Sequence, residues 1–129
     1  MQPTRDGRPN IMVVDEEPDI TGPIAAGLQM HGFDVDSYND PVEAISNFRS
    51  GKYDLVLLDI NMPRMNGFHV YRELKKADKN VRICFFTSFD LYESEFRKIF
   101  PEVKVQRFLK KPLSIATLTE EVNRLLVAQ

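Results

Sequence analysis

The chain has 129 residues, which suits one domain with its own hydrophobic core and leaves no room for a second. Its formal net charge of −2 argues against direct nucleic-acid binding, because such an interface usually gathers Lys and Arg on one face. No apolar stretch is long enough to span a membrane, and the single cysteine, Cys84, cannot form an internal disulfide. We therefore expect a cytoplasmic protein that contacts neither a membrane nor nucleic acid directly.

Residues 1–9 form a polar stretch without periodicity, which predicts a flexible tail ahead of a domain over residues 10–129. The first strand is predicted at residues 11–14, a wholly apolar run typical of central parallel strands. Residues 18–31 carry apolar side chains at helical spacing, with a proline near the start and a glycine just past the end, and predict a helix. The next run, 33–38, alternates between apolar and polar residues, which places its strand nearer an edge of the sheet.

A second helix is predicted over residues 41–50, because a capping aspartate precedes it and a glycine closes it. The wholly apolar run at 55–58 predicts another central strand. Residues 66–77 place apolar side chains on one stripe and predict a third helix. A further apolar run at 81–86 predicts the fourth strand.

The last third of the chain continues the alternation, with a helix predicted over 90–100, a strand over 105–109 and a helix over 114–127. Five strands alternating with five helices indicate an α/β domain built on a five-stranded parallel sheet. Right-handed crossovers then place helices on both faces, which makes the sheet doubly wound.

Polar residues follow four of the five predicted strands. They are Asp15, Glu16, Asp59, Thr87, Ser88, Lys110 and Lys111. Ligands of an open parallel sheet bind outside the carboxyl ends of its strands, so these residues are expected to share one site. Carboxylates gathered there repel each other unless a cation joins them, and their hard oxygens suit Mg2+. The ammonium and hydroxyl groups complete a pocket for a phosphoryl group, with Asp59 as the nucleophile.

Four segments, taken in order, resemble the motifs of the response regulator receiver (CheY-like) family of two-component signal transduction. They are VVDEEPDI at 13–20, DLVLLDINMP with MNG at 54–67, FTS at 86–88 and FLKKP at 108–112. The resemblance implies a flavodoxin-like fold and a phosphorelay function. A sensor histidine kinase or phosphotransfer protein would pass a phosphoryl group from its phosphohistidine to Asp59, and the domain would then change conformation for an unknown output partner. The chain would be no enzyme but a phosphoprotein that assists its own phosphorylation and dephosphorylation.

The resemblance also implies a Mg2+ site. Asp15 and Glu16 would hold the metal together with Asp59, and the backbone carbonyl of Asn61 would add another ligand. Glu16 departs from the more common aspartate, and its extra methylene is expected to alter the metal affinity. A simpler interpretation of Asp15 and Glu16 is that they favour the start of the following helix.

Other positions would act on the phosphoryl group or respond to it. By the resemblance, Lys111 would pair with its oxygens, and the bond from Lys111 to Pro112 is a candidate cis peptide. Thr87 would move to bind the phosphate and Phe108 would turn inward, as a two-state switch. A static, half-buried aromatic is the simpler interpretation of Phe108. Residues 100–105 replace the small-residue turn of the family, beside the face of the fourth helix, fifth strand and fifth helix that would carry output and homodimerisation.

Two other functions compete with an active receiver. A phosphatase of the haloacid dehalogenase class would use Asp59 for turnover, but it typically carries a second aspartate where this chain has Asn61. A degenerate receiver would act as an unphosphorylated binding module, although all the acids, the threonine and the lysine are present. The chain is either a stand-alone regulator or a receiver taken from a longer protein.

Overall fold

The computed structural model describes residues 7–87, 94, 97–98, 101, 107–111 and 113–127. Its five strands form one parallel sheet in the order β2-β1-β3-β4-β5. The strands are β1 (Asn10–Val14), β2 (Asp34–Tyr38), β3 (Leu55–Leu58), β4 (Ile83–Thr87) and β5 (Arg107–Lys110). The helices of the described part are α1 (Pro18–Met30), α2 (Pro41–Asn47), α3 (Gly67–Ala77) and α5 (Ile115–Val127).

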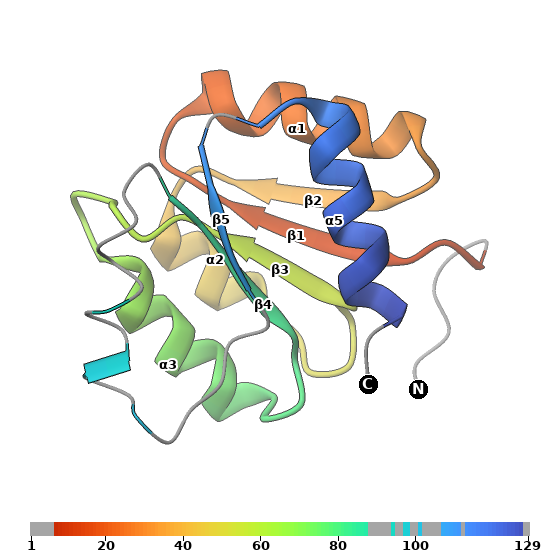
Figure 1. Ribbon diagram of the computed structural model, residues 1–129. Coiled ribbons are helices and arrows are strands. Elements are labelled where there is room, and N and C mark those ends of the chain that lie inside the picture. The colour runs from red at the N-terminus through yellow and green to blue at the C-terminus, as the bar shows by residue number, and fades with distance from the viewer. Residues whose placement is uncertain are drawn as a thin grey trace.

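Helices cover both faces of the sheet, as predicted: α1 and α5 lie on one face, and α2 and α3 lie on the other (Figure 1). The predicted helix over 90–100 lies mostly outside the described residues, although residues 94, 97 and 98 are helical. Part of the predicted N-terminal tail, residues 1–6, also lies outside them. Within the described residues, no helix combines the length and the apolarity needed to cross a bilayer.

The two wholly apolar strands occupy the centre of the sheet, which confirms the prediction. Alternate residues of β3 enter opposite cores: Val56 and Leu58 pack under α2 and α3, whereas Leu55 and Leu57 pack under α1 and α5. Strand β2 lies at an edge and none of its residues is fully buried, which fits its alternating sequence. The lone cysteine, Cys84, lies on β4 under α1 and α5 with an exposed fraction of 0%.

Helix α2 ends at Asn47, so the predicted end at residue 50 is wrong. Phe48 leaves the helix with an extended backbone, buries its ring and stacks on Tyr53 at 5.8 Å between centroids. The Nη1 of Arg49 donates to the carbonyl oxygens of Ser46 and Phe48, which satisfies acceptors at the helix end. Burial of one aromatic ring therefore shortens the helix.

Arg82 ties the start of β4 to the end of α5. The predicted strand began at residue 81, but β4 begins at Ile83, and the Nη1 of Arg82 donates to the carbonyls of Leu125 (2.6 Å) and Leu126 (2.7 Å). Arg82→Met is expected to lower the free energy of unfolding by about 2 kcal/mol, because these charge-assisted bonds are partly buried. Urea unfolding measures the loss. The control is Arg124→Met, which removes an exposed ion pair and is expected to cost less than about 0.5 kcal/mol. Equal losses in the two variants would contradict the anchoring role of Arg82.

Candidate functional site

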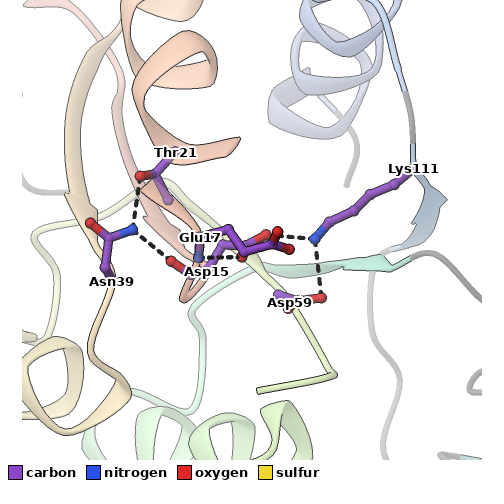
Figure 2. Close-up of polar contacts among 6 residues, drawn as sticks. All are labelled: Asp15, Glu17, Thr21, Asn39, Asp59 and Lys111. Atoms are coloured by element: carbon purple, nitrogen blue, oxygen red, sulfur yellow. Dashed lines mark hydrogen bonds and ion pairs between the residues drawn. The ribbon is translucent and has the colours of Figure 1, made fainter. Parts of the chain in front are cut away.

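Three charged side chains from distant parts of the chain meet at the carboxyl edge of the sheet (Figure 2). Asp15 follows β1, Asp59 follows β3 and Lys111 follows β5. The Lys111 Nζ lies 2.6 Å from Asp15 Oδ2 and 3.4 Å from Asp59 Oδ1. Both aspartates are almost fully buried, with exposed fractions of 1% for Asp15 and 5% for Asp59. The predicted meeting of these three residues is thereby confirmed.

The sheet itself positions these groups. The backbone N–H of Asp59 donates to the carbonyl of Val14 at 2.9 Å, and the N–H of Lys111 donates to the carbonyl of Thr87 at 2.7 Å. Each bond extends the hydrogen-bonding of parallel strands by one residue. The side chains therefore leave the backbone at places set by the strand register.

Both carboxylate oxygens and the backbone carbonyl oxygen of Asp15 accept hydrogen bonds. Its Oδ1 accepts from the Glu17 N–H at 3.0 Å, while its Oδ2 accepts from Lys111. Its backbone carbonyl accepts from Asn39 Nδ2 at 2.8 Å, and the same amide donates to Thr21 Oγ1 at 2.9 Å (Figure 2). Asn39 was not among the predicted site residues, although it follows β2 at the same edge of the sheet, where the strand-end rule applies to it as well.

Burial and charge shift the acid–base behaviour of the cluster. Burial, together with the neighbouring charge of Asp15, raises the pKa of Asp59 from 3.8 to about 6, against the opposing effects of Lys111 and of a backbone hydrogen bond from Asn61. Burial opposes the charged form of Lys111, but its hydrogen bond to Asp15 and the charge of Asp59 outweigh this and raise its pKa. At pH 7 the site therefore holds an ionised Asp59 carboxylate beside a charged Lys111 ammonium.

The side chain of Glu16 contacts the loop between β3 and α3. Its Oε2 accepts from the backbone N–H of Arg64 at 3.2 Å, in the loop between β3 and α3. Among the described residues, no group of three or more acidic, histidine or cysteine side chains is arranged to hold a metal ion. Mg2+ nevertheless needs only one or two protein carboxylates, since waters and phosphate oxygens fill its other positions. The donor pair Asp15 and Asp59 fits that requirement, and their mutual repulsion favours a cation.

The remaining predicted residues flank the cluster. Thr87 ends β4 with an exposed fraction of 3%. Asn61 is exposed, and its backbone N–H donates a hydrogen bond to the carboxylate of Asp59. Phe108 is half-buried on β5, with its ring 5.2 Å from that of Phe85. Its ring thus packs against the core under α2 and α3 in this structure. Motion of Thr87 and Phe108 stays a prediction.

Some predictions fall on residues that the structure does not describe. Ser88 and Pro112 are among them, so the predicted cis bond between Lys111 and Pro112 lies outside the described residues. The same holds for most of the segment 100–105, on which an altered output face was predicted.

Gly67 begins α3 directly against the loop that carries Asp59. A Cβ atom at this position would lie 2.4 Å from the carbonyl oxygen of Asp59 and 2.7 Å from the Cα of Ile60. The backbone of Gly67 donates to the carbonyl of Ile60 at 2.8 Å, which holds this approach in place. Only a residue without a side chain allows this close approach at the start of the helix.

Comparisons with known proteins agree with this geometry. Residues 11–123 match the family described as response regulator receiver domain. The transcriptional regulatory protein PrrA of Mycobacterium leprae is 30% identical over 118 residues, which cover 92% of this chain and 50% of that protein. CusR of Escherichia coli K12, also a transcriptional regulatory protein, is 29% identical over 116 residues, which cover 90% of this chain and 50% of its own. The chain thus spans about half the length of these relatives.

Solved structures give the same result. The response regulator protein TrrA of Thermotoga maritima, crystallised in complex with Mg(2+)-BeF, has a TM-score of 0.78 and 33% identity, covering 91% of this chain and 98% of that one. The non-phosphorylated HemR receiver domain of Leptospira biflexa has a TM-score of 0.82 at 20% identity, covering 95% of this chain and 97% of that one, and supports the fold.

Proposed function

Because the chain belongs to the response regulator receiver family, we propose that Asp59 accepts a phosphoryl group from the phosphohistidine of a sensor histidine kinase or phosphotransfer protein. The observation that carries the proposal is the buried cluster in which the Lys111 Nζ lies within 3.4 Å of Asp59 Oδ1 and 2.6 Å of Asp15 Oδ2. A buried carboxylate beside a fixed ammonium suits the transfer, because phosphoryl transfer depends on positioning and on neutralising negative charge.

Each side chain has a separate task. An ionised oxygen of Asp59 attacks phosphorus while the phosphorus–nitrogen bond of the donor breaks. Lys111 places its positive charge against the phosphoryl oxygens, and the Thr87 hydroxyl donates to one of them. Burial lowers the effective dielectric constant around the cluster and so strengthens each of these contacts.

The site is also proposed to take Mg2+, as the complex of TrrA with Mg(2+)-BeF suggests by similarity. Asp15 and Asp59 would hold the ion, and Glu16 and the carbonyl of Asn61 would join them. The ion supplies positive charge that offsets the repulsion between two carboxylates and an incoming phosphoryl group.

Phosphorylation would then be read through Thr87 and Phe108. The relatives PrrA and CusR carry the name transcriptional regulatory protein and are about twice as long as this chain. We therefore propose that the receiver controls an output partner, of DNA-binding type in the simplest case, within the cytoplasm. Dimerisation through the fourth helix, fifth strand and fifth helix stays a prediction.

Intact-mass measurement tests the proposed acceptor. With acetyl phosphate and Mg2+, the wild-type protein is expected to gain the mass of one phosphoryl group. Asp59→Asn and a wild-type sample with EDTA are expected to gain none. A gain that survives Asp59→Asn would show that the acceptor is another residue.

The degenerate receiver is the second candidate, and the same experiment separates it from the first. It would gain no mass from acetyl phosphate or from purified histidine kinases. The buried Lys111–Asp59 pair speaks against it, because a binding module has no need to keep these charges out of water at a cost in free energy.

A further inference from the structure

The residues that follow β2 contact both of the loops that carry the acids. Asn39 and Asp40 lie between β2 and α2. On one side is the acidic turn, residues 15–17, and on the other is the acceptor loop, residues 59–66. Asn39 and Asp40 provide no group to the reaction described above, yet each sends its side chain to one of these segments.

Asn39 holds the acidic turn. Its Nδ2 donates to the backbone carbonyl of Asp15 at 2.8 Å and to Thr21 Oγ1 at 2.9 Å (Figure 2). Thr21 is 3% exposed in the first half of α1, so the amide joins the turn to a buried point of the helix. This contact fixes the main chain from which the Asp15 carboxylate projects.

Asp40 holds the acceptor loop and divides its two oxygens between two tasks. Its Oδ1 accepts from the Val42 N–H at 2.9 Å and so caps α2, while its Oδ2 pairs with Arg64 Nη1 at 3.0 Å. Arg64 in turn donates its backbone N–H to Glu16. The acidic turn and the acceptor loop are thus joined twice, once through Asn39 and Asp40 and once directly through the bond from Arg64 to Glu16.

We propose that Asn39 and Asp40 are positioning residues that set the spacing between the acidic turn and the acceptor loop, and with it the affinity of the site for Mg2+. The inference rests on the proposed function, since it assumes that Asp15 and Asp59 hold the ion. Outer contacts that orient metal ligands commonly change metal affinity by ten- to a hundredfold when they are lost. Here those contacts act through the backbone of Asp15 and through Arg64.

Two variants that change the net charge in opposite directions test the link through Arg64. Asp40→Asn keeps an oxygen for capping α2 but loses the pair with Arg64, and Arg64→Ala loses the same pair from the other side. If charge alone mattered, removing a negative group would weaken Mg2+ binding and removing a positive group would strengthen it. If spacing matters, both variants weaken binding, by on the order of tenfold.

The readout is the Mg2+ dissociation constant from amide chemical shifts of Asp59 and Asn61 during titration with MgCl2. The double variant of Asp40→Asn with Arg64→Ala is expected to bind no more weakly than either single variant, because one contact is lost in all three. Urea midpoints are expected to stay unchanged, since exposed ion pairs contribute little to stability. Dissociation constants that move in opposite directions, or that equal the wild-type value, would overturn the inference.

Asn39→Ala tests the other side and leaves the charge unchanged. It is expected to weaken Mg2+ binding by on the order of tenfold. The matched control is Asn47→Ala, which removes an exposed side-chain amide bonded to the carbonyl of Glu43 on α2 and is expected to leave the affinity unchanged. If Asn39→Ala does not fold, the Asp40 and Arg64 variants still decide the question. A wild-type protein whose amides do not respond to Mg2+ at all would instead refute the metal site of the proposed function, and the inference with it.

Discussion

Asp59→Asn is expected to raise the free energy of unfolding by about 3 kcal/mol at pH 7 while it abolishes phosphoryl uptake. Burial and the charge of Asp15 raise the pKa of the folded-state carboxyl from 3.8 to about 6. Each unit of such a shift corresponds to about 1.4 kcal/mol, so a shift of about two units gives this magnitude. The Asp59 carboxylate thus carries its charge at a cost in the free energy of unfolding.

The pH dependence identifies the cause. Because the folded-state pKa lies above the unfolded value, the protonated carboxyl favours the folded protein, and this stability is fully present below pH 3.8. It is lost as the pH rises through about 6, so the wild-type protein loses stability relative to Asp59→Asn between these values. Urea unfolding at several pH values measures the gap. The control is Asn47→Ala on the exposed side of α2, which removes no ionisable group, so its curve is expected to run parallel to that of the wild type.

Two results would count against this account. Parallel curves for wild type and Asp59→Asn would mean that the carboxyl has no raised pKa in the folded protein. A gap that does not narrow on addition of Mg2+ would mean that the ion does not bind beside Asp59, since a ligand that binds only the folded wild type stabilises it.

Gly67→Ala is expected to lower the free energy of unfolding by about 3 kcal/mol, because the new methyl group would overlap backbone atoms. Its Cβ would lie 2.4 Å from the carbonyl oxygen of Asp59, and neither partner is a flexible side chain that can turn away. The strain falls on the loop that sets the 3.4 Å separation between Asp59 and Lys111. Phosphoryl uptake from acetyl phosphate is therefore expected to slow by about a hundredfold in the molecules that remain folded.

Two other glycines provide matched controls. Gly22 lies exposed in α1, and a Cβ there would meet no atom within 4 Å outside its chain neighbours, of which Pro23 disfavours a larger residue before it in a helix. Gly22→Ala is therefore expected to change the free energy of unfolding by less than about 1 kcal/mol. The three atoms nearest to a Cβ on Gly27 would be side-chain atoms of Ile115, at 2.7 to 2.9 Å, so Gly27→Ala is expected to fall between the other two. Urea unfolding ranks the three variants. A Gly67→Ala protein as stable and as active as wild type would contradict the predicted overlap between its Cβ and the backbone of Asp59 and Ile60.

The sheet was predictable because burial on two faces leaves a simple pattern in the sequence. The wholly apolar runs at 11–14 and 55–58 became β1 and β3, at the centre of the sheet. The ends of elements were less predictable where a contact far away in the sequence decides them. Phe48 ends α2 by packing on Tyr53, and no local pattern shows that partner.

The site was predictable to a similar depth. Ligands gather at the carboxyl ends of parallel strands, and from the sequence alone this rule predicts that Asp15, Asp59 and Lys111 meet. The rule places backbones, however, and cannot say where a flexible side chain turns. The longer Glu16 side chain accepts a hydrogen bond from the backbone of Arg64, a contact that the strand-end rule does not predict. Asn39 was overlooked because its amide contacts a main-chain atom, which leaves no charge pattern in the sequence.

The burial of the one cysteine gives this protein an internal reporter of its own opening. Cys84 is paired within the sheet between β3 and β5 and has an exposed fraction of 0%, so a thiol reagent cannot reach it in the closed molecule. Because the chain has only one sulfhydryl, each modified molecule records one opening event that separated the sheet from α1 and α5. Rates of Cys84 labelling with and without a phosphoryl donor would then measure how strongly phosphorylation at the carboxyl edge stabilises the core under α1 and α5. No engineered probe is needed.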